Sequence, residues 1–208
     1  MTGNKLSNEP QMRIAAKLRI DRTDYIHNDL SNAALHIFKR VQAAQNEDRR
    51  EGIGLDIMAA IVMTAFTFES YLNFVGQRVL EESWTEKEPV FKKIKFLSEK
   101  LSIDWNENIR PFSTLKELHR IRNFLAHGKP QPTKRDWKSV GTHDELQMEL
   151  QSFIPDWQTG VSYEFLERAF EDVDAVWRLL LDTAGITSFD TLSGGSSSIE
   201  FIQFIGDN

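Results

Sequence analysis

One segment of the chain, 115–130, brings together residue types that could carry out chemistry. Ser113 suits an N-cap, and Gly128 with Pro130 behind it is a strong helix stop. A helix of about four turns is therefore predicted over 114–127. Its apolar side chains recur at helical spacing and predict a buried stripe formed by Leu115, Leu118, Ile121 and Leu125.

Arg122 falls inside the arc of that stripe, which is an unusual place for an arginine. Because an unpaired buried charge is costly, its guanidinium should have a carboxylate or phosphate partner. His119, Asn123 and His127 form a polar flank beside it. A guanidinium grips a phosphate and an imidazole moves protons near neutral pH, so the set suits phosphodiester cleavage without a metal. The alternative is an ion pair within the bundle and a histidine at a helix end.

The best partner for Arg122 is Glu69, which lies on the longest predicted helix, 55–82. Glu69 sits one position from Phe68, at the edge of a broad apolar face that marks this helix as central. An ion pair between the two side chains is therefore predicted. The alternative is a half-exposed glutamate that pairs with nothing.

The predicted helix resembles the R-x4-6-H signature of the HEPN superfamily, with Asn directly after Arg: Arg122-Asn123-Phe124-Leu125-Ala126-His127. The likeness covers mainly 55–128 and a later helix. It implies an all-α, dimeric protein in which two copies of the motif form one cleft. Arg122 would hold the scissile phosphate, His127 would move a proton at the 2′-OH or the leaving oxygen, and Asn123 would orient His127 or the phosphate. Glu69 and His119 are supporting candidates.

Three functions follow from these observations. The first is a metal-independent endoribonuclease of toxin or phage-defence type, with RNA as substrate and a homodimer as the active form. The second is a non-catalytic dimeric helical module that binds a nucleotide, RNA or a partner protein. The third is a nucleotide-modifying enzyme, or a toxin paired with an antitoxin or a nucleotidyltransferase. No cofactor and no metal site is expected.

The net charge of −6 argues against a general nucleic-acid coat protein, but the charge is uneven. Segment 110–138 holds eight basic and two acidic residues, a local charge of +6. This basic island suits a phosphate site, with four residues as candidates for the RNA backbone: Arg120, Lys129, Lys134 and Arg135. Solvated basic side chains without a ligand are the alternative. Trp137 could stack on a base or cover the edge of the core.

A length of 208 residues indicates one domain, or one domain with extensions, and the 40% of apolar residues suffice for a real core. The chain has no cysteine, which excludes a disulfide framework and a cysteine zinc site and fits a cytoplasmic protein. The N-terminus has no apolar signal region, and the apolar run 57–68 is too short for a membrane span. A cytoplasmic location without a membrane role is therefore expected.

Apolar periodicity predicts an all-α, up-and-down bundle of four to five main helices over 21–186. A short β or irregular insert is predicted near 143–155, because apolar residues alternate at Leu146, Met148 and Leu150. The wet face of one helix is expected to carry Lys92, Lys93 and Lys95. The five main helices of the predicted bundle are expected at 23–45, 55–82, 89–101, 114–127 and 162–184.

Two extensions flank this predicted bundle. Residues 1–20 form an N-terminal extension that is expected to be disordered over 1–10 and to hold a short helix over 11–20. Residues 187–208 read as a Gly/Ser linker followed by an apolar tail. The tail could pack on its own domain, join a dimer or stay free, and the sequence does not choose among these.

Overall fold

The computed structural model describes residues 13–130, 132–155 and 158–205. It divides into two compact units, a helical unit over Ile26–Thr191 and a unit formed by the two ends of the chain, Met1–Tyr25 with Leu192–Asn208. The expected disorder over 1–10 lies outside the described residues.

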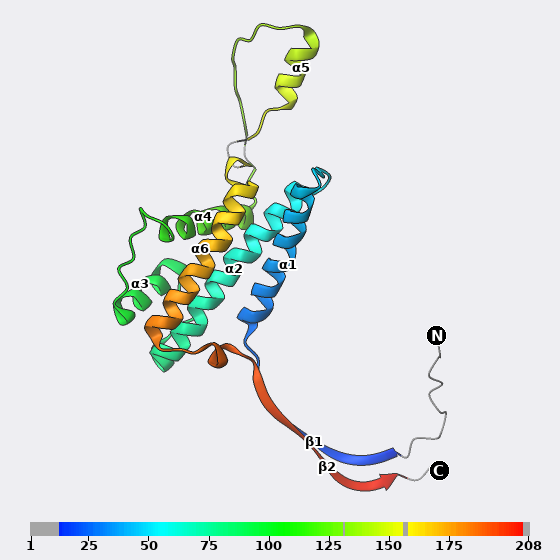
Figure 1. Ribbon diagram of the computed structural model, residues 1–208, viewed down its shortest axis with the longest axis vertical. Coiled ribbons are helices and arrows are strands. Elements are labelled where there is room, and N and C mark those ends of the chain that lie inside the picture. The colour runs from blue at the N-terminus through cyan, green and yellow to red at the C-terminus, as the bar shows by residue number, and fades with distance from the viewer. Residues whose placement is uncertain (1–12, 131, 156–157, 206–208) are drawn as a thin grey trace. The chain divides into compact units, whose positions relative to one another are not determined.

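The helical unit contains six α-helices among its described residues (Figure 1). Their bounds are α1 Ile26–Asn46, α2 Ile53–Leu80, α3 Val90–Leu101, α4 Phe112–His127, α5 His143–Gln151 and α6 Tyr163–Ala184. Three short 3₁₀ segments are also present: η1 Glu81–Ser83 between α2 and α3, η2 Gln158–Gly160 between α5 and α6, and η3 Ser188–Thr191 after α6. The five helices predicted from periodicity are all present. The fold is mostly helical, which is compatible with the predicted all-α class, and it also contains a two-stranded sheet.

Helix α2 is the centre of this unit, since it packs against α1, α3, α4 and α6. In Figure 1, α1, α2 and α6 run side by side, and α3 and α4 lie on the side away from α1. Leu72 and Val75 of α2 are completely buried, as is Val176 of α6. Aromatic rings join the elements further, because Trp177 of α6 stacks on Tyr71 of α2 at 4.0 Å between centroids. The site helix α4 is thus held against a well-packed scaffold.

One helix of the described chain, Ile53–Ser83, is long and apolar enough by length and composition to cross a membrane. In this structure 44% of its most apolar window is buried inside the protein. Its position among four other helices is that of a core helix in a bundle.

Helix α4 begins two residues before the predicted start, with Pro111 at the N-cap in place of Ser113. The backbone nitrogen of Ser113 already donates to the carbonyl of Ile109, and that of Leu115 donates to Pro111. Ser113 therefore lies inside the first turn. The predicted end is confirmed, because Gly128 adopts a left-handed φ of 51° at the C-cap.

The β or irregular insert predicted near 143–155 is wrong for its first part, because 143–151 form α5. Thr142 and Glu145 make a capping box that starts the helix, with Thr142 donating its N–H to the Glu145 carboxylate at 2.7 Å. The alternating apolar residues misled the prediction because no residue of α5 is buried. Without a buried face, the alternation carries no information about a sheet.

The second unit is an antiparallel pair of strands, β1 Arg13–Thr23 and β2 Gly194–Ile205. The short helix predicted over 11–20 is therefore wrong for residues 13–20. Within the predicted linker and tail, residues 188–191 are η3 and residues 194–205 are β2. The pairing joins segments that lie near opposite ends of the given sequence, so a local sequence pattern cannot predict it.

Candidate functional site

Glu69 of α2 lies between two cationic side chains. Its Oε2 accepts a hydrogen bond from Arg122 Nη2 of α4 at 2.7 Å. Its Oε1 accepts from Lys93 Nζ of α3 at 2.9 Å. The predicted ion pair between Arg122 and Glu69 is thus present, and a second cation that was not predicted completes it.

Lys93 is the most buried charged side chain of this group, with 1% of the side chain exposed. The expectation that it belongs to a wet face is therefore wrong. Burying an ammonium group is costly unless a carboxylate compensates it, and Glu69 supplies that carboxylate. Lys93 stands four residues before Leu97 and three after Val90, both buried, so the angular argument that located Arg122 could have found it too.

Arg122 continues the network outward from the core. Its Nη1 donates to Asn123 Oδ1 at 2.7 Å, and its guanidinium lies 5.1 Å from the centroid of the Phe66 ring. About a fifth of the Arg122 side chain, 22%, is exposed. The guanidinium is therefore held by a carboxylate, an amide oxygen and an aromatic face, which together fix its direction.

Asn123 passes the network on to a histidine. With its oxygen occupied by Arg122, its Nδ2 donates to His119 Nε2 at 2.9 Å. That bond requires His119 to be neutral, with its proton on Nδ1. The His119 ring meets the Phe91 ring edge-on, with centroids 5.1 Å apart. Sequence reasoning named His119 as a supporting residue, and the structure ties it directly to the motif.

The surroundings of His119 favour the same neutral form. Burial lowers the pKa of the imidazole, the nearby Arg122 charge lowers it further, and the Glu69 carboxylate partly opposes them. A neutral imidazole with its lone pair on Nε2 can accept a proton at that atom.

His127 occupies the last turn of α4 and is exposed. It lines a surface depression of about 260 Å³ together with Asn123, Phe124 and Lys129. Within the described part of the chain, the side chain of His127 makes no hydrogen bond or ion pair. Asn123, which was expected to orient His127 or a phosphate, is hydrogen-bonded to His119 instead, yet it borders the same depression as His127.

The candidate RNA-binding residues have different surroundings. Arg120 is bound to Glu117 through two hydrogen bonds of 2.9 and 2.6 Å. Lys129 lines the depression next to His127, and Lys134 is exposed. The Arg135 guanidinium lies 4.9 Å from the centroid of the Phe153 ring. Of these four, Lys129 is the residue that the structure brings to the motif.

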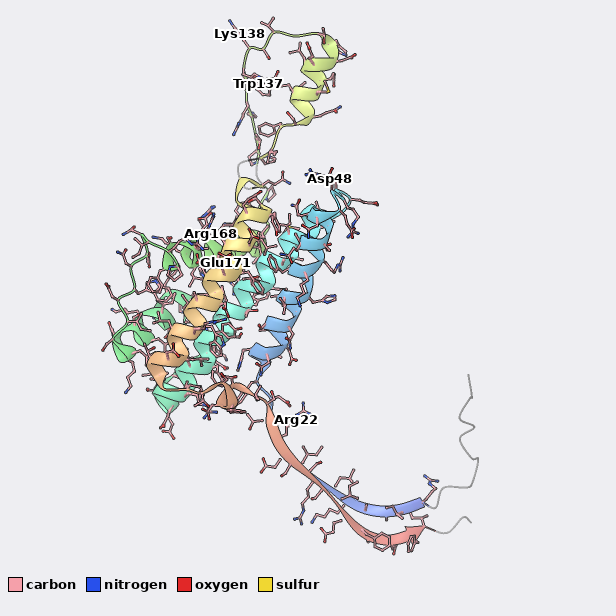
Figure 2. The ribbon with its side chains drawn as sticks, viewed as in Figure 1. Arg22, Asp48, Trp137, Lys138, Arg168 and Glu171 are labelled. Atoms are coloured by element: carbon pink, nitrogen blue, oxygen red, sulfur yellow. The ribbon has the colours of Figure 1, made fainter. Side chains whose placement is uncertain are left out.

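Four basic residues of the 110–138 island are compensated by carboxylates. Arg122 and Arg120 are described above, and Lys116 pairs with Glu107 at 2.8 Å. Arg110 binds Asp172 at 2.9 Å and Glu171 at 3.2 Å, on the face of α6 where Glu171 is labelled in Figure 2. The local charge of +6 is therefore spread over ion pairs, and the exposed positive charge is smaller than the sequence suggests.

Trp137 does not cover the edge of the core in this structure. It is 46% exposed and lies, with Lys138, on the loop that leads into α5 (Figure 2). Its indole N–H donates to Glu149 of α5 at 2.7 Å. Ser139 donates to the other oxygen of the same carboxylate at 2.6 Å. Trp137 therefore helps to attach this loop to α5 through Glu149.

Among the described residues, no group of three or more His, Cys, Asp or Glu side chains is arranged to hold a metal ion. The candidate site consists of a hydrogen-bonded chain, Lys93–Glu69–Arg122–Asn123–His119, and of the depression that begins at Asn123. Comparison of this chain with protein-family models, with curated proteins and with solved structures found no match.

Proposed function

We propose that this chain is a metal-independent endoribonuclease of the HEPN type that acts in the cytoplasm as a homodimer. One observation carries the proposal: Asn123 accepts a hydrogen bond from Arg122 and also borders the depression lined by His127 and Lys129. A cation held in a fixed direction, a free imidazole and an exposed ammonium group thus gather around one amide. These are the groups that phosphodiester cleavage requires.

The charge of the site favours a phosphate ligand. Lys93 and Arg122 carry two positive charges against the single negative charge of Glu69. Lys129 adds another positive charge at the depression. An excess of positive charge stabilises the dianionic phosphorane that develops when a phosphodiester is attacked.

In the proposed reaction the 2′-oxygen of a ribose attacks the adjacent phosphorus. His127 of one copy takes the proton of the 2′-OH, and His127 of a second copy donates a proton to the leaving 5′-oxygen. The new bond joins the 2′-oxygen to phosphorus while the bond from phosphorus to the 5′-oxygen breaks. The products are a 2′,3′-cyclic phosphate and a 5′-OH, and DNA, which lacks the nucleophile, is not cleaved.

A second copy of the chain enters the proposal because the resemblance to the HEPN superfamily implies a dimer, with which the geometry of α4 is compatible. Arg122 and His127 are five residues apart, which separates them by about 140° around α4. Two copies of α4 related by a twofold axis would place an arginine of one copy near a histidine of the other. Such a dimer would also supply one histidine as base and one as acid.

The test is cleavage of single-stranded RNA by the purified protein in EDTA. We expect wild type to cleave and His127→Ala to lose at least about 100-fold of the rate, the usual contribution of a general acid or base. His36→Ala is the matched control, because His36 is also exposed but lies on α1. Unchanged cleavage by His127→Ala, with all three proteins equally folded, would refute the assignment of His127.

A second candidate, a non-catalytic helical module, is favoured by a different observation. Arg122 is already held by Glu69 and Asn123 within one copy, as a structural ion pair that joins α2 to α4 would be. In that case Arg122→Ala lowers the stability of the fold, and neither Arg122→Ala nor His127→Ala changes the behaviour of RNA in the same assay.

A further inference from the structure

The two-stranded unit has one apolar face and one polar face. Residues that pair across β1 and β2 lie on the same face, and successive pairs alternate between the faces. One face carries the pairs Ile14–Phe204, Ala16–Phe201, Leu18–Ile199 and Ile20–Ser197. The other carries Arg13–Ile205, Ala15–Gln203, Lys17–Glu200, Arg19–Ser198 and Asp21–Ser196. The unit is therefore amphipathic along its length.

A β-bulge preserves this separation. The register shifts between Ala15 and Ala16, which pair with Gln203 and Phe201, so that Ile202 is the extra residue of β2. In a regular strand, Phe201 and Phe204 would point to opposite faces because they are three residues apart. In the structure their ring centroids lie 4.9 Å apart. The bulge thus gathers both aromatic rings on the apolar face.

This apolar face is open in the isolated chain. Its six large side chains have exposed fractions between 46% for Ile14 and 77% for Ile20. Taking roughly 200 Å² for a fully exposed side chain of this size, the face presents on the order of 750 Å² of apolar surface. Soluble monomers rarely expose a continuous apolar patch of that area. A two-stranded ribbon is also at best marginally stable in water by itself.

We propose that this face, made of Ile14, Ala16, Leu18 and Ile20 with Ile199, Phe201 and Phe204, is a homodimer interface that packs on the same face of a second copy. The area presented matches the approximately 800 Å² per partner that a stable interface buries. The face between Ile14 and Ile20 carries no charged side chain, so it is complementary to itself across a twofold axis. The two ribbons form a two-layered sandwich, with the polar faces outward.

The first test measures self-association of the full-length chain by analytical ultracentrifugation. Wild type is expected to sediment as a dimer at micromolar concentration. The variant Phe201→Ser/Phe204→Ser should raise the dimer dissociation constant on the order of 100-fold or more, because aromatic burial is lost in both copies. The control Lys17→Ser/Gln203→Ser changes the opposite face of the same ribbon and should leave the constant unchanged.

A second test covers the case in which the serine variant does not form the two-stranded ribbon, because it leaves the large apolar side chains in place. The chain has no cysteine, so Ala16→Cys and Ala15→Cys place single thiols on the apolar and polar faces. Cys at 16 should react with a maleimide at least about 10-fold more slowly than Cys at 15, and dilution should abolish this protection, as expected for burial in a dissociable interface.

Three outcomes overturn the inference: a dimer that the Phe201→Ser/Phe204→Ser change leaves intact, equal reactivity of the two thiols, or protection that persists in a monomer. The last would mean that the face covers another surface of its own chain. None of these readouts involves RNA cleavage. A dimer formed through α4 alone would persist in the Phe201→Ser/Phe204→Ser variant, so failure of this inference can be distinguished from failure of the proposed function.

Discussion

At the scale of single residues, Glu69 determines the geometry of the site. One carboxylate accepts from Lys93 on α3 and from Arg122 on α4, so two helices are fixed to α2 through a single side chain. The lysine end of this group is completely buried, while Arg122 reaches partial solvent exposure. The same contact that compensates a buried charge therefore also aims the guanidinium at Asn123.

We expect Glu69→Gln to lower the free energy of unfolding by about 2–4 kcal/mol. A glutamine offers one acceptor oxygen to two cations, and its NH₂ group faces the other. Adding Lys93→Met should restore part of the loss, because it removes the buried charge. Urea denaturation measures the effect, with exposed Glu51→Gln as a control that changes stability by no more than about 0.5 kcal/mol. A Glu69→Gln variant as stable as that control would show that the network contributes nothing to the fold.

At the scale of elements, α2 is the scaffold on which the site is built. The hydroxyl groups of its buried threonine and serine residues are satisfied within the helix, as Thr64 donates to the carbonyl of Ala60 at 2.8 Å. Near its C-terminal end, Gly76 lets the indole of Trp84 pack directly against the helix backbone. This contact returns the chain onto α2 just before α3, the helix that carries Lys93.

We expect Gly76→Ala to destabilise the protein by about 2 kcal/mol, although alanine is the better helix former. A Cβ at Gly76 would overlap the six-membered ring of Trp84, which would have to leave its buried position. Gly54→Ala is the matched control on the same helix, since a Cβ there meets no atom within 4 Å. That change should be neutral or should stabilise by up to about 1 kcal/mol. Thermal unfolding of both variants checks the contrast, which disappears if Trp84 can move freely.

At the scale of the whole molecule, the positive island on an acidic chain is weaker than it appears from composition. Four of its eight basic residues are bound to carboxylates, and two of those carboxylates lie on α6. RNA would therefore meet a small number of uncompensated positive charges. Lys129 is the one that borders the candidate site.

If the chain binds RNA at this site, the logarithm of the binding constant should fall with the logarithm of salt concentration with a slope of about −2 to −4. Lys129→Ala should reduce the size of that slope by about 1. Lys39→Ala removes the same kind of exposed charge from α1 and should leave the slope unchanged. Fluorescence anisotropy with a labelled RNA in the His127→Ala background measures both. An unchanged slope for Lys129→Ala would exclude a phosphate contact by this residue.

Much of the helical unit could be predicted because its signals are local. Apolar spacing located five helices, and Gly128 identified the end of α4. The partner of Arg122 could also be predicted, since a guanidinium within an apolar arc requires a carboxylate and Glu69 was the available one on the central helix. The assignment of α5 failed because its apolar alternation faced no core, and the capping box between Thr142 and Glu145 was the stronger signal.

The five main helices, the C-terminal end of α4 and the need for an ion pair could therefore be predicted, because their signals lie within a few residues of one another in the chain. The structure was needed to see that Lys93 joins that pair, that Asn123 turns to His119 and that β1 and β2 pair. The first and the last depend on which distant surfaces meet, whereas Asn123 turns to His119 on its own helix because Arg122 occupies its oxygen. A lysine at the edge of an apolar stripe, or a strand near one end of the chain, meets its partner only when distant segments come together. Local periodicity in the sequence carries no information about such contacts.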